Sequence, residues 1–356
     1  MNQERIARVL DKMRGQGLDS LLICDVQSIQ YLTDLLVYPG ERLWALCLRT
    51  NGEHCFFANR LFGEIKTDYP VTYMDDTDDI MTIVAQELKS SRFLGVDKNL
   101  AARWLLPLLE KNSECRYALG SDCVDDVRAC KDEEEKELMR TASRINDECI
   151  VLLAQHLYEG ITEVEAAAYL EKLYAERGAN ASFGLIVSFG PNGADPHHVC
   201  DDTPLRPGDG IVIDVGCLYK GYCSDMTRTY FYKYAPEEYV NIYNIVLRAN
   251  EAAERMVRAG ERLCDIDACA RNIIAAEGYG EYFTHRLGHF IGREVHEKGD
   301  VSAAYTNAAV SGNVFSIEPG IYLPGKFGVR IEDLVLVTED GCEILNHVSK
   351  ELSVLG

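Results

Sequence analysis

The stretch FSIEPGIYLPGKFGVRIEDLVLV, residues 315–337, decides the fold, because two apolar strand-like runs flank a Pro-Gly turn. A turn centred on Gly325 predicts an antiparallel register with Glu318 directly opposite Glu332. Opposed side chains on neighbouring strands have Cβ atoms about 5 Å apart, and like charges there repel unless a cation lies between them. Both acids stand in apolar strand contexts, where an unpaired carboxylate is costly. The stretch therefore predicts a hairpin that brings two carboxylates to a metal ion.

A second stretch, IVIDVGCLYKGYCSDMTRTYF at residues 211–231, repeats this arrangement. With its turn centred between Tyr219 and Lys220, Asp214 is predicted to lie directly opposite Asp225. An isolated aspartate pair is more often explained by a turn or surface position. Two hairpins with the same arrangement favour a shared metal site instead.

Histidines cluster in HRLGHFIGREVHE, residues 285–297, which contains His285, His289 and His296. Imidazole can complete a carboxylate metal site or transfer protons near neutral pH, and a lone histidine would more often be structural. His197 and His198 follow a Gly/Pro/Asn loop, and we expect at most one of them to face a site.

Arg330 stands two residues before Glu332 and is expected on the same strand face. Its guanidinium could neutralise excess carboxylate charge, hold an acidic group of a ligand, or form a plain salt bridge. The sequence leaves these uses open.

Composition excludes several classes of protein. The 356 residues contain 36 Lys and Arg against 57 Asp and Glu, a formal net charge of −21, which disfavours binding to nucleic acid or anionic membrane. The 13 cysteines, an odd number without a CxxC pair, indicate buried free thiols and a reducing, cytoplasmic location. No signal peptide and no apolar run of about 18 residues is found.

The length predicts two domains, 1–127 and 128–356, with the boundary before the charged run RACKDEEEKELMR. In the first, strand-like runs at 21–24, 45–48, 55–58, 71–74 and 93–96 alternate with helical patterns at 6–13, 79–88 and 100–111. The second contains a long helix to about residue 156, helices at 162–177 and 236–258, and strand-like runs. We expect an α/β domain followed by an α+β domain.

These motifs together resemble a known family. The order Asp214, Asp225, His289 in a GHxxG setting, Glu318 in IEPG and Glu332 in RIED is similar to that of the pita-bread metallopeptidases, which include prolidases, aminopeptidases P and methionine aminopeptidases. The opening ERIARVLDKMRGQGLDSLLICDVQSIQYLTD resembles the creatinase-type N-terminal domain that methionine aminopeptidases lack. The resemblance covers nearly the full length and is strongest to bacterial Xaa-Pro dipeptidases. It implies a creatinase-like domain followed by a pita-bread catalytic domain.

The resemblance also implies roles for individual residues. The ligands of two metal ions would be Asp214, Asp225, His289, Glu318 and Glu332, with Glu318 also accepting the proton of the attacking water. His197 and His296 would contact the substrate carbonyl, His285 would handle protons, and Arg330 would support the ligands. Four carboxylates and one imidazole form a hard site, suited to manganese and also to cobalt, zinc or iron.

Three residues depart from the family pattern. Phe290 stands where a small glycine is usual, and is expected either to narrow the site or to match the aromatic residue found there in some aminopeptidases P. Lys298 and Asp300 follow His296 where a proline is common, and are expected to change how a substrate C-terminus is recognised.

The implied activity is hydrolysis of Xaa-Pro dipeptides by a homodimer acting on short peptides. The alternatives are an aminopeptidase P acting on longer Xaa-Pro peptides, a metal-free creatinase-like amidinohydrolase, and a non-catalytic binding protein. The five retained ligands argue against the last two.

Overall fold

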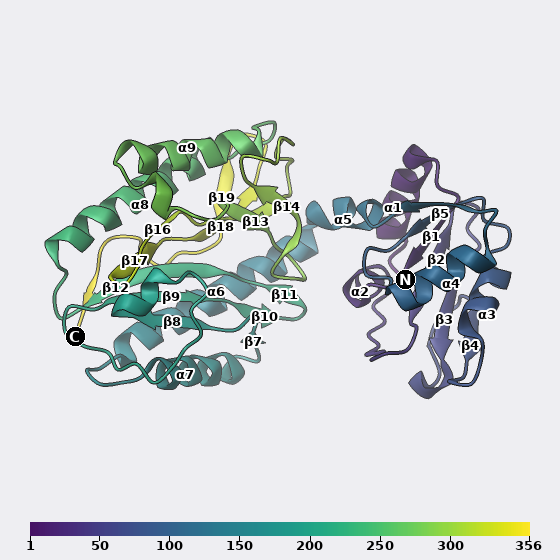
Figure 1. Cartoon of the computed structure of the whole chain (residues 1–356), viewed down its shortest axis with the longest axis horizontal. Helices are drawn as coiled ribbons and strands as arrows, with labels where there is room; N and C mark the ends of the chain where they lie inside the picture. Colours follow the sequence, from purple (N-terminus) through teal and green to yellow (C-terminus); the bar gives the residue numbers. More distant parts are fainter. The chain divides into compact units, whose positions relative to one another are not determined.

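The computed structural model describes all 356 residues, which form two compact units, Met1–Arg128 and Ala129–Gly356 (Figure 1). The first unit is built on a six-stranded mixed sheet in the order β4-β3-β2-β1-β5-β6. Its strands are β1 Ser20–Ile23, β2 Ala45–Arg49, β3 Cys55–Asn59, β4 Val71–Met74, β5 Phe93–Val96 and β6 Arg116–Leu119. Its helices are α1 Gln3–Gln16, α2 Val26–Thr33, α3 Ile80–Glu87, α4 Ala102–Lys111 and α5 Asp122–Ala129, with a 3-10 turn at Arg60–Phe62.

The α/β character expected for this unit is confirmed. Helix α1 begins where the Asn2 side chain accepts a hydrogen bond from Arg5 N, and it ends at Gly17, whose φ is 73°. Its apolar stripe buries Ile6, Val9 and Met13 against the sheet. Helices α2 and α5 and strand β6 have no counterpart among the predicted elements.

The second unit places helices on both sides of its strands: α6 Glu133–His156 and α7 Glu163–Glu176 on one side, α8 Glu237–Met256 and α9 Leu263–Ala276 on the other (Figure 1). One sheet has the order β20-β12-β9-β8, from β8 Ile186–Phe189, β9 Gly210–Val215, β12 Met226–Tyr232 and β20 Val354–Leu355. The other has the order β14-β13-β15-β18-β19, from β13 Gly288–Phe290, β14 Glu297–Val301, β15 Val314–Ile317, β18 Asp333–Val337 and β19 Cys342–Ile344.

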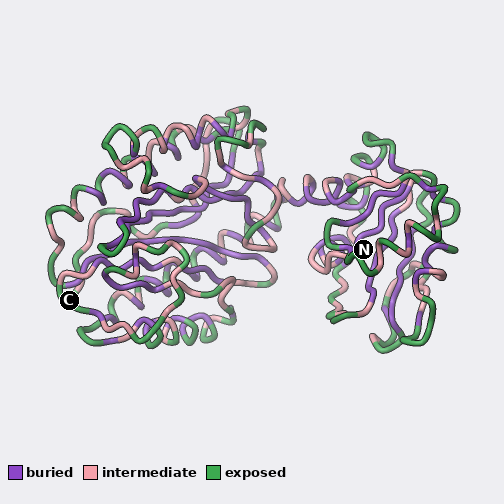
Figure 2. The backbone as a smooth tube through the Cα atoms, viewed as in Figure 1, coloured by how far each residue is buried: buried purple, intermediate pink, exposed green.

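Short ladders complete this unit: β7 Asn180–Ala181, β10 Cys217–Tyr219 and β11 Tyr222–Cys223 in one, β16 Gly320–Leu323 and β17 Phe327–Arg330 in another, with 3-10 turns at Gly190–Ala194 and Gly280–Tyr282. Buried backbone runs through the strands between the helices, while exposed segments follow the outer helices and loops (Figure 2). The expected α+β class is confirmed.

The register predicted for the hairpin around Gly325 is confirmed. Strand β16 pairs with β17 through Ile321 opposite Val329, and β15 continues the same register with β18 through Ile317 opposite Asp333. Glu318 and Glu332 therefore stand between two ladders that share one register.

The register predicted for the other hairpin is wrong by two residues. Asp214 pairs with Thr227, not with Asp225. The turn is formed by Lys220 and Gly221, whose φ values of 48° and 83° are those of a two-residue turn with both central residues left-handed. Because a shift of two residues keeps a side chain on the same face of a strand, Asp225 still faces the same side as predicted.

Two further expectations need correction. Helix α9 was not predicted, because its buried stripe includes Ala270, Asp267 and Cys264, which weaken the apolar period. The charged run 128–140 is not uniformly solvated: Lys131 is buried against Glu297, and Glu135 accepts a hydrogen bond from Tyr222.

All 13 cysteines are free, with eight buried and five partly buried. No helix combines the length and the apolarity that crossing a membrane requires.

Gly288 on β13 lies against the backbone of β15, so that a Cβ there would stand 1.8 Å from Ser316 O. We expect Gly288→Ala to lower the free energy of unfolding by about 1–3 kcal/mol or more, because backbone must move. Urea unfolding measures this, with Gly184→Ala as the control, since a Cβ at Gly184 meets open space. Equal stability of the two variants would contradict the packing described.

Candidate metal centre

A cavity of about 420 Å³ opens in the second unit, and all nine predicted site residues contribute to its wall. They are Asp214, Asp225, His289, Glu318 and Glu332, the predicted metal ligands, and His197, His285, His296 and Arg330. The remaining wall is largely apolar, from Phe183, Ile186, Pro196 and Val295, with Arg286 as a further cation. Two hairpins and the segment around β13 therefore converge on one site, and the roles given to the nine residues stay predictions.

The centre of the site is an imidazole surrounded by carboxylates. Ligand atoms of Asp225, His289 and Glu332 all lie within 4.8 Å of one another. His289 Nε2 is 3.7 Å from Asp225 Oδ2 and 3.5 Å from Glu318 Oε1. Its other nitrogen, Nδ1, lies 3.3 Å from Phe290 O, and since a carbonyl only accepts, Nδ1 carries the proton. The lone pair of Nε2 thus faces the oxygens of two acids.

The protonation equilibria reflect this crowding of acceptors. Burial, reinforced by the neighbouring carboxylates, raises the pKa of Asp225 and of Glu332 well above the usual values. Burial also raises the pKa of Glu318 to about 7. Burial, together with the nearby His296, lowers the pKa of His289 to about 3, so its imidazole is neutral and can bind a metal ion.

Hydrogen bonds leave part of this acceptor set unsatisfied. Thr227 Oγ1 donates to Glu332 Oε2 at 2.6 Å, and Ser316 Oγ donates to Glu318 Oε1 at 2.9 Å. Asp225 Oδ1 is buried and has no hydrogen-bond partner. A buried, unpaired carboxylate oxygen beside an imidazole lone pair fits a divalent cation, because a cation satisfies both at once.

Asp214 occupies the edge of this cluster, paired with Arg330. Arg330 NH2 lies 2.5 Å from Asp214 Oδ2, and the same guanidinium donates to Tyr322 OH at 2.8 Å. The ion pair with Asp214 inside the site fits both neutralisation of carboxylate charge and a plain salt bridge, two of the uses considered for Arg330.

His285 has both ring nitrogens engaged. Nδ1 lies 2.7 Å from Arg286 O and must donate, which leaves Nε2 to accept from Tyr322 OH at 2.8 Å. Burial and the nearby Arg330 lower the pKa of His285 to about 4, so it is neutral. Tyr322 therefore links His285 to Arg330.

Two histidines present exposed rings at the cavity, His197 and His296, and the ring of His296 lies edge-on to His289 with centroids 4.4 Å apart. His197 lies in the cavity wall, and His198 does not. His198 Nε2 instead bonds Glu163 Oε2 at 2.7 Å.

Glu163, His198 and Asp201 form a second group with metal-ligand side chains. The Glu163 carboxylate, however, already accepts from Phe189 N, Asn192 Nδ2 and Asp201 N. These bonds account for its buried charge, and they fix the loop that carries His197.

The expectation that Phe290 narrows the site is wrong. Phe290 packs on Phe315 with ring centroids 5.4 Å apart and belongs to the apolar core. The reason is strand alternation: His289 faces the cavity, so its neighbour on β13 faces away. Asp300 does reach the site indirectly, through an ion pair with Arg286.

Sequence reasoning missed Arg286, which lines the cavity, and three hydroxyl residues. Thr227 and Ser316 hold acids of the site, and Tyr322 links His285 to Arg330. Arg286 lies within the histidine motif, and its charge between His285 and His289 was an available signal. The hydroxyl residues carry no signal of their own, because their importance depends on which acid they reach.

Comparison with known proteins agrees with this geometry. The family model described as metallopeptidase family M24 matches residues 137–339, and that of the creatinase/prolidase N-terminal domain matches residues 5–130. An uncharacterized peptidase of Staphylococcus aureus (strain USA300) is 36% identical over 352 residues, covering 97% of this chain and 99% of the relative.

Among solved structures, a prolidase from Thermococcus sibiricus is 33% identical with a TM-score of 0.93, covering 100% of this chain and 99% of that one. An X-Pro aminopeptidase from Thermotoga maritima is 30% identical with a TM-score of 0.82, covering 97% and 100%.

We expect divalent metal to bind this site more tightly as pH rises. The raised pKa values mean that protons and metal compete for the same carboxylates; Glu318, with a pKa of about 7, is half protonated near neutral pH. Protonation of these carboxyl groups stabilises the metal-free chain fully below the ordinary carboxyl pKa. This stabilisation is lost as pH rises through about 7, whereas stabilisation of the chain by bound metal increases. Mn²⁺ titrations of chelator-treated protein at about pH 6, 7 and 8 measure this. A pH-independent Kd would contradict it.

Proposed function

Because the chain belongs to metallopeptidase family M24, we propose that it hydrolyses the Xaa-Pro bond of dipeptides with two divalent metal ions. The observation that carries the proposal is the cavity itself. It combines an acid-imidazole cluster, a largely apolar wall and the single guanidinium of Arg286 beyond that cluster. These are the features needed to hold metal, a proline ring and a free carboxylate in one cavity.

The proposed metal ligands are Asp214, Asp225, His289, Glu318 and Glu332. Supporting this set are the neutral His289, whose free Nε2 faces carboxylates, and the unpaired Asp225 Oδ1. When bound, two such ions supply a water of lowered pKa and stabilise negative charge that develops on the scissile carbonyl. The donor set is oxygen-rich with one nitrogen, for which we propose manganese.

Glu318 is the proposed proton carrier. Its Oε1 lies 3.5 Å from His289 Nε2 within the acid cluster, where the carboxylate can accept a proton from the attacking water and return it to the leaving imino nitrogen. Ser316 holds one of its oxygens, which fixes the rotamer.

His197 and His296 are the proposed donors to the substrate carbonyl oxygen, because both present exposed rings at the cavity. His285 is engaged at both nitrogens, so its proposed part in proton handling runs through Tyr322.

Arg286 favours a dipeptidase over an enzyme for longer peptides. Its guanidinium lies in the cavity wall, where an ion pair with Asp300 fixes its position. A dipeptide presents a carboxylate directly after the proline, and a guanidinium recognises that group strongly. In a longer peptide an uncharged amide takes this place.

An aminopeptidase P activity is the second candidate, supported by similarity to the X-Pro aminopeptidase from Thermotoga maritima. The metal-free amidinohydrolase is disfavoured, because Asp225, His289 and Glu332 bring three metal-ligand side chains within reach of one ion.

We expect Glu318→Gln to lower kcat/KM for Ala-Pro by about 10²–10⁴-fold, because the amide cannot accept the water proton. Part of the metal should remain bound, since the other ligands are intact. Steady-state kinetics with elemental analysis measure both, and exposed Glu281→Gln serves as the control. Full turnover by Glu318→Gln would rule out this role.

Arg286→Gln should raise KM for Ala-Pro by about 10- to 100-fold, the loss expected for a hydrogen bond to a charged group. Hydrolysis of Ala-Pro-amide should be nearly unchanged, because that substrate lacks the carboxylate. Arg293→Gln is the matched control, since Arg293 lies in the same segment but outside the cavity wall. If wild type prefers Ala-Pro-Ala and Arg286→Gln affects every substrate equally, the aminopeptidase reading replaces the dipeptidase one.

A further inference from the structure

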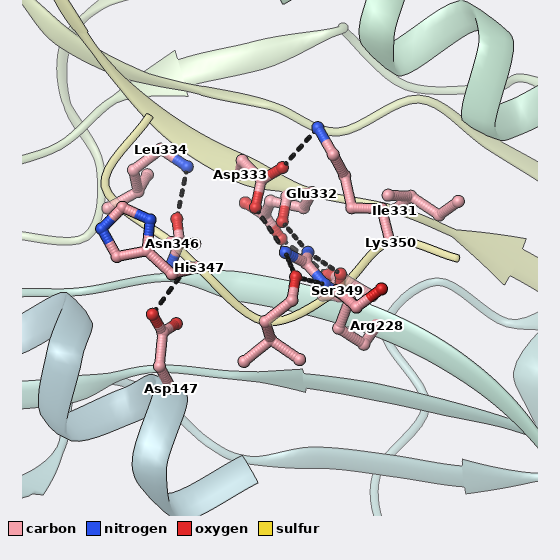
Figure 3. A network of polar contacts seen from close by, with 12 residues as sticks. Asp147, Arg228, Ile331, Glu332, Asp333, Leu334, Asn346, His347, Ser349 and Lys350 are labelled. Carbon is pink, nitrogen blue, oxygen red and sulfur yellow. Dashed lines mark hydrogen bonds and ion pairs between the residues drawn. The ribbon is translucent and has the colours of Figure 1, made fainter. Parts of the chain in front are cut away.

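The C-terminal segment Asn346–Lys350 lies behind the acid cluster, where it meets β12 and β18 (Figure 3). These two strands carry or adjoin the acids of the site: Asp225 immediately precedes β12, and Glu332 immediately precedes β18. Side chains from this region connect the main chains of both.

Asn346 makes the first connection. Its side-chain Nδ2 donates to Asp225 O at 3.2 Å, and its Oδ1 accepts from Leu334 N at 2.7 Å. The side chain is buried, with 4% of its residue surface exposed. The Asn346 amide group thus joins the backbone of Asp225 to the backbone of Leu334, two residues beyond Glu332.

Arg228 makes the second connection from the opposite strand. Its NH1 donates to Glu332 O at 2.6 Å, and its NH2 bonds Asp333 Oδ1 at 2.6 Å and Val348 O at 2.7 Å. Figure 3 shows this guanidinium between β12, the Glu332–Asp333 backbone and the C-terminal segment.

Lys350 and Asn250 extend the network toward the remaining acid. Lys350 Nζ lies 2.9 Å from both Asp333 Oδ2 and Asn250 Oδ1. Asn250 Nδ2 in turn donates to Ile317 O at 2.9 Å and Ile331 O at 3.3 Å, the carbonyls next to Glu318 and Glu332.

We propose that Asn346 and Arg228 are positioning residues that hold the acid-bearing backbones at the separation that metal binding requires; this inference rests on the metal centre proposed above. Asp225 and Glu332 belong to separate backbone segments, so the distance between their carboxylates depends on how these segments are held together. Metal-ligand distances tolerate only about 0.2 Å of error. The bonds that Asn346 and Arg228 make to main-chain groups therefore fix the backbone of the site before metal binds. The hydroxyl contacts to the carboxylates fix only side chains.

The test measures Mn²⁺ binding by isothermal titration of chelator-treated protein. Asn346→Asp keeps the acceptor for Leu334 N and loses the donor to Asp225 O, while Asn346→Leu removes both without adding charge. We expect each to raise the Mn²⁺ Kd by about 10- to 100-fold. Arg228→Lys breaks the other connection and provides an independent result if the Asn346 variants do not fold.

Tyr243→Phe is the matched control. Tyr243 OH donates to Lys350 O at 2.8 Å, so the variant loses a hydrogen bond to the same segment without untying β12 from β18. We expect its Mn²⁺ Kd to stay within about threefold of wild type, the spread that context allows. Circular dichroism and the metal-free Tm check folding, because a purely structural role would lower Tm and leave the Kd of the folded protein unchanged.

The outcomes separate the two proposals. Weakened binding in the Asn346 and Arg228 variants, beyond that of Tyr243→Phe, supports the positioning role. Binding as tight as in the control overturns it and leaves the metal centre standing. A wild-type chain that binds no Mn²⁺ overturns the metal centre and the positioning role together.

Discussion

The structure depends on one electrostatic constraint, the convergence of buried carboxylates on the lone pair of a single neutral imidazole. Asp225 and Glu332 are buried around His289, and Glu318 lies 3.5 Å from its Nε2. In a dry interior this arrangement is strongly unfavourable without positive charge between the groups. The fold must therefore hold the acids together against their own repulsion, and a cation must make the arrangement stable. The scaffold meets the first requirement, and a metal ion held by these residues would meet the second.

The same constraint explains where the chain puts its arginines. The chain has a formal net charge of −21. Even so, three arginines, Arg330, Arg228 and Arg286, lie at or behind this cavity. Arg330 pairs with Asp214, and Arg228 pairs with Asp333 beneath the acid strands. Guanidinium suits both places, because it keeps its charge when buried and bonds several acceptors in fixed directions. Arg286 lies in the cavity wall, where it is paired with Asp300.

The sequence predicted the register of one hairpin correctly and that of the other incorrectly. The Pro-Gly turn fixed the register of β16 and β17 correctly, since a turn centred on Gly325 leaves little freedom. The register predicted for the other hairpin was wrong by two residues. Its turn requires a positive φ at Lys220, which a lysine in the sequence does not indicate. This error did not change which acids were predicted to share one face, because side chains two residues apart on a strand lie on the same face.

Other features were beyond reach of the sequence for physical reasons. The backbone ties made by Asn346 join segments more than a hundred residues apart, and no local pattern encodes them. Comparison of motifs placed Phe290 at the site. In the structure its strand neighbour His289 faces the cavity, and Phe290 therefore packs into the core. Contacts of this kind follow from tertiary packing, which residue type and spacing do not specify.

The most direct test of the account is anomalous scattering from crystals grown with Mn²⁺. The account predicts two anomalous peaks, about 3.5–4 Å apart, among Asp214, Asp225, His289, Glu318 and Glu332. Peaks confined to the Glu163, His198 and Asp201 group, or no peak in the cavity at saturating Mn²⁺, would contradict it.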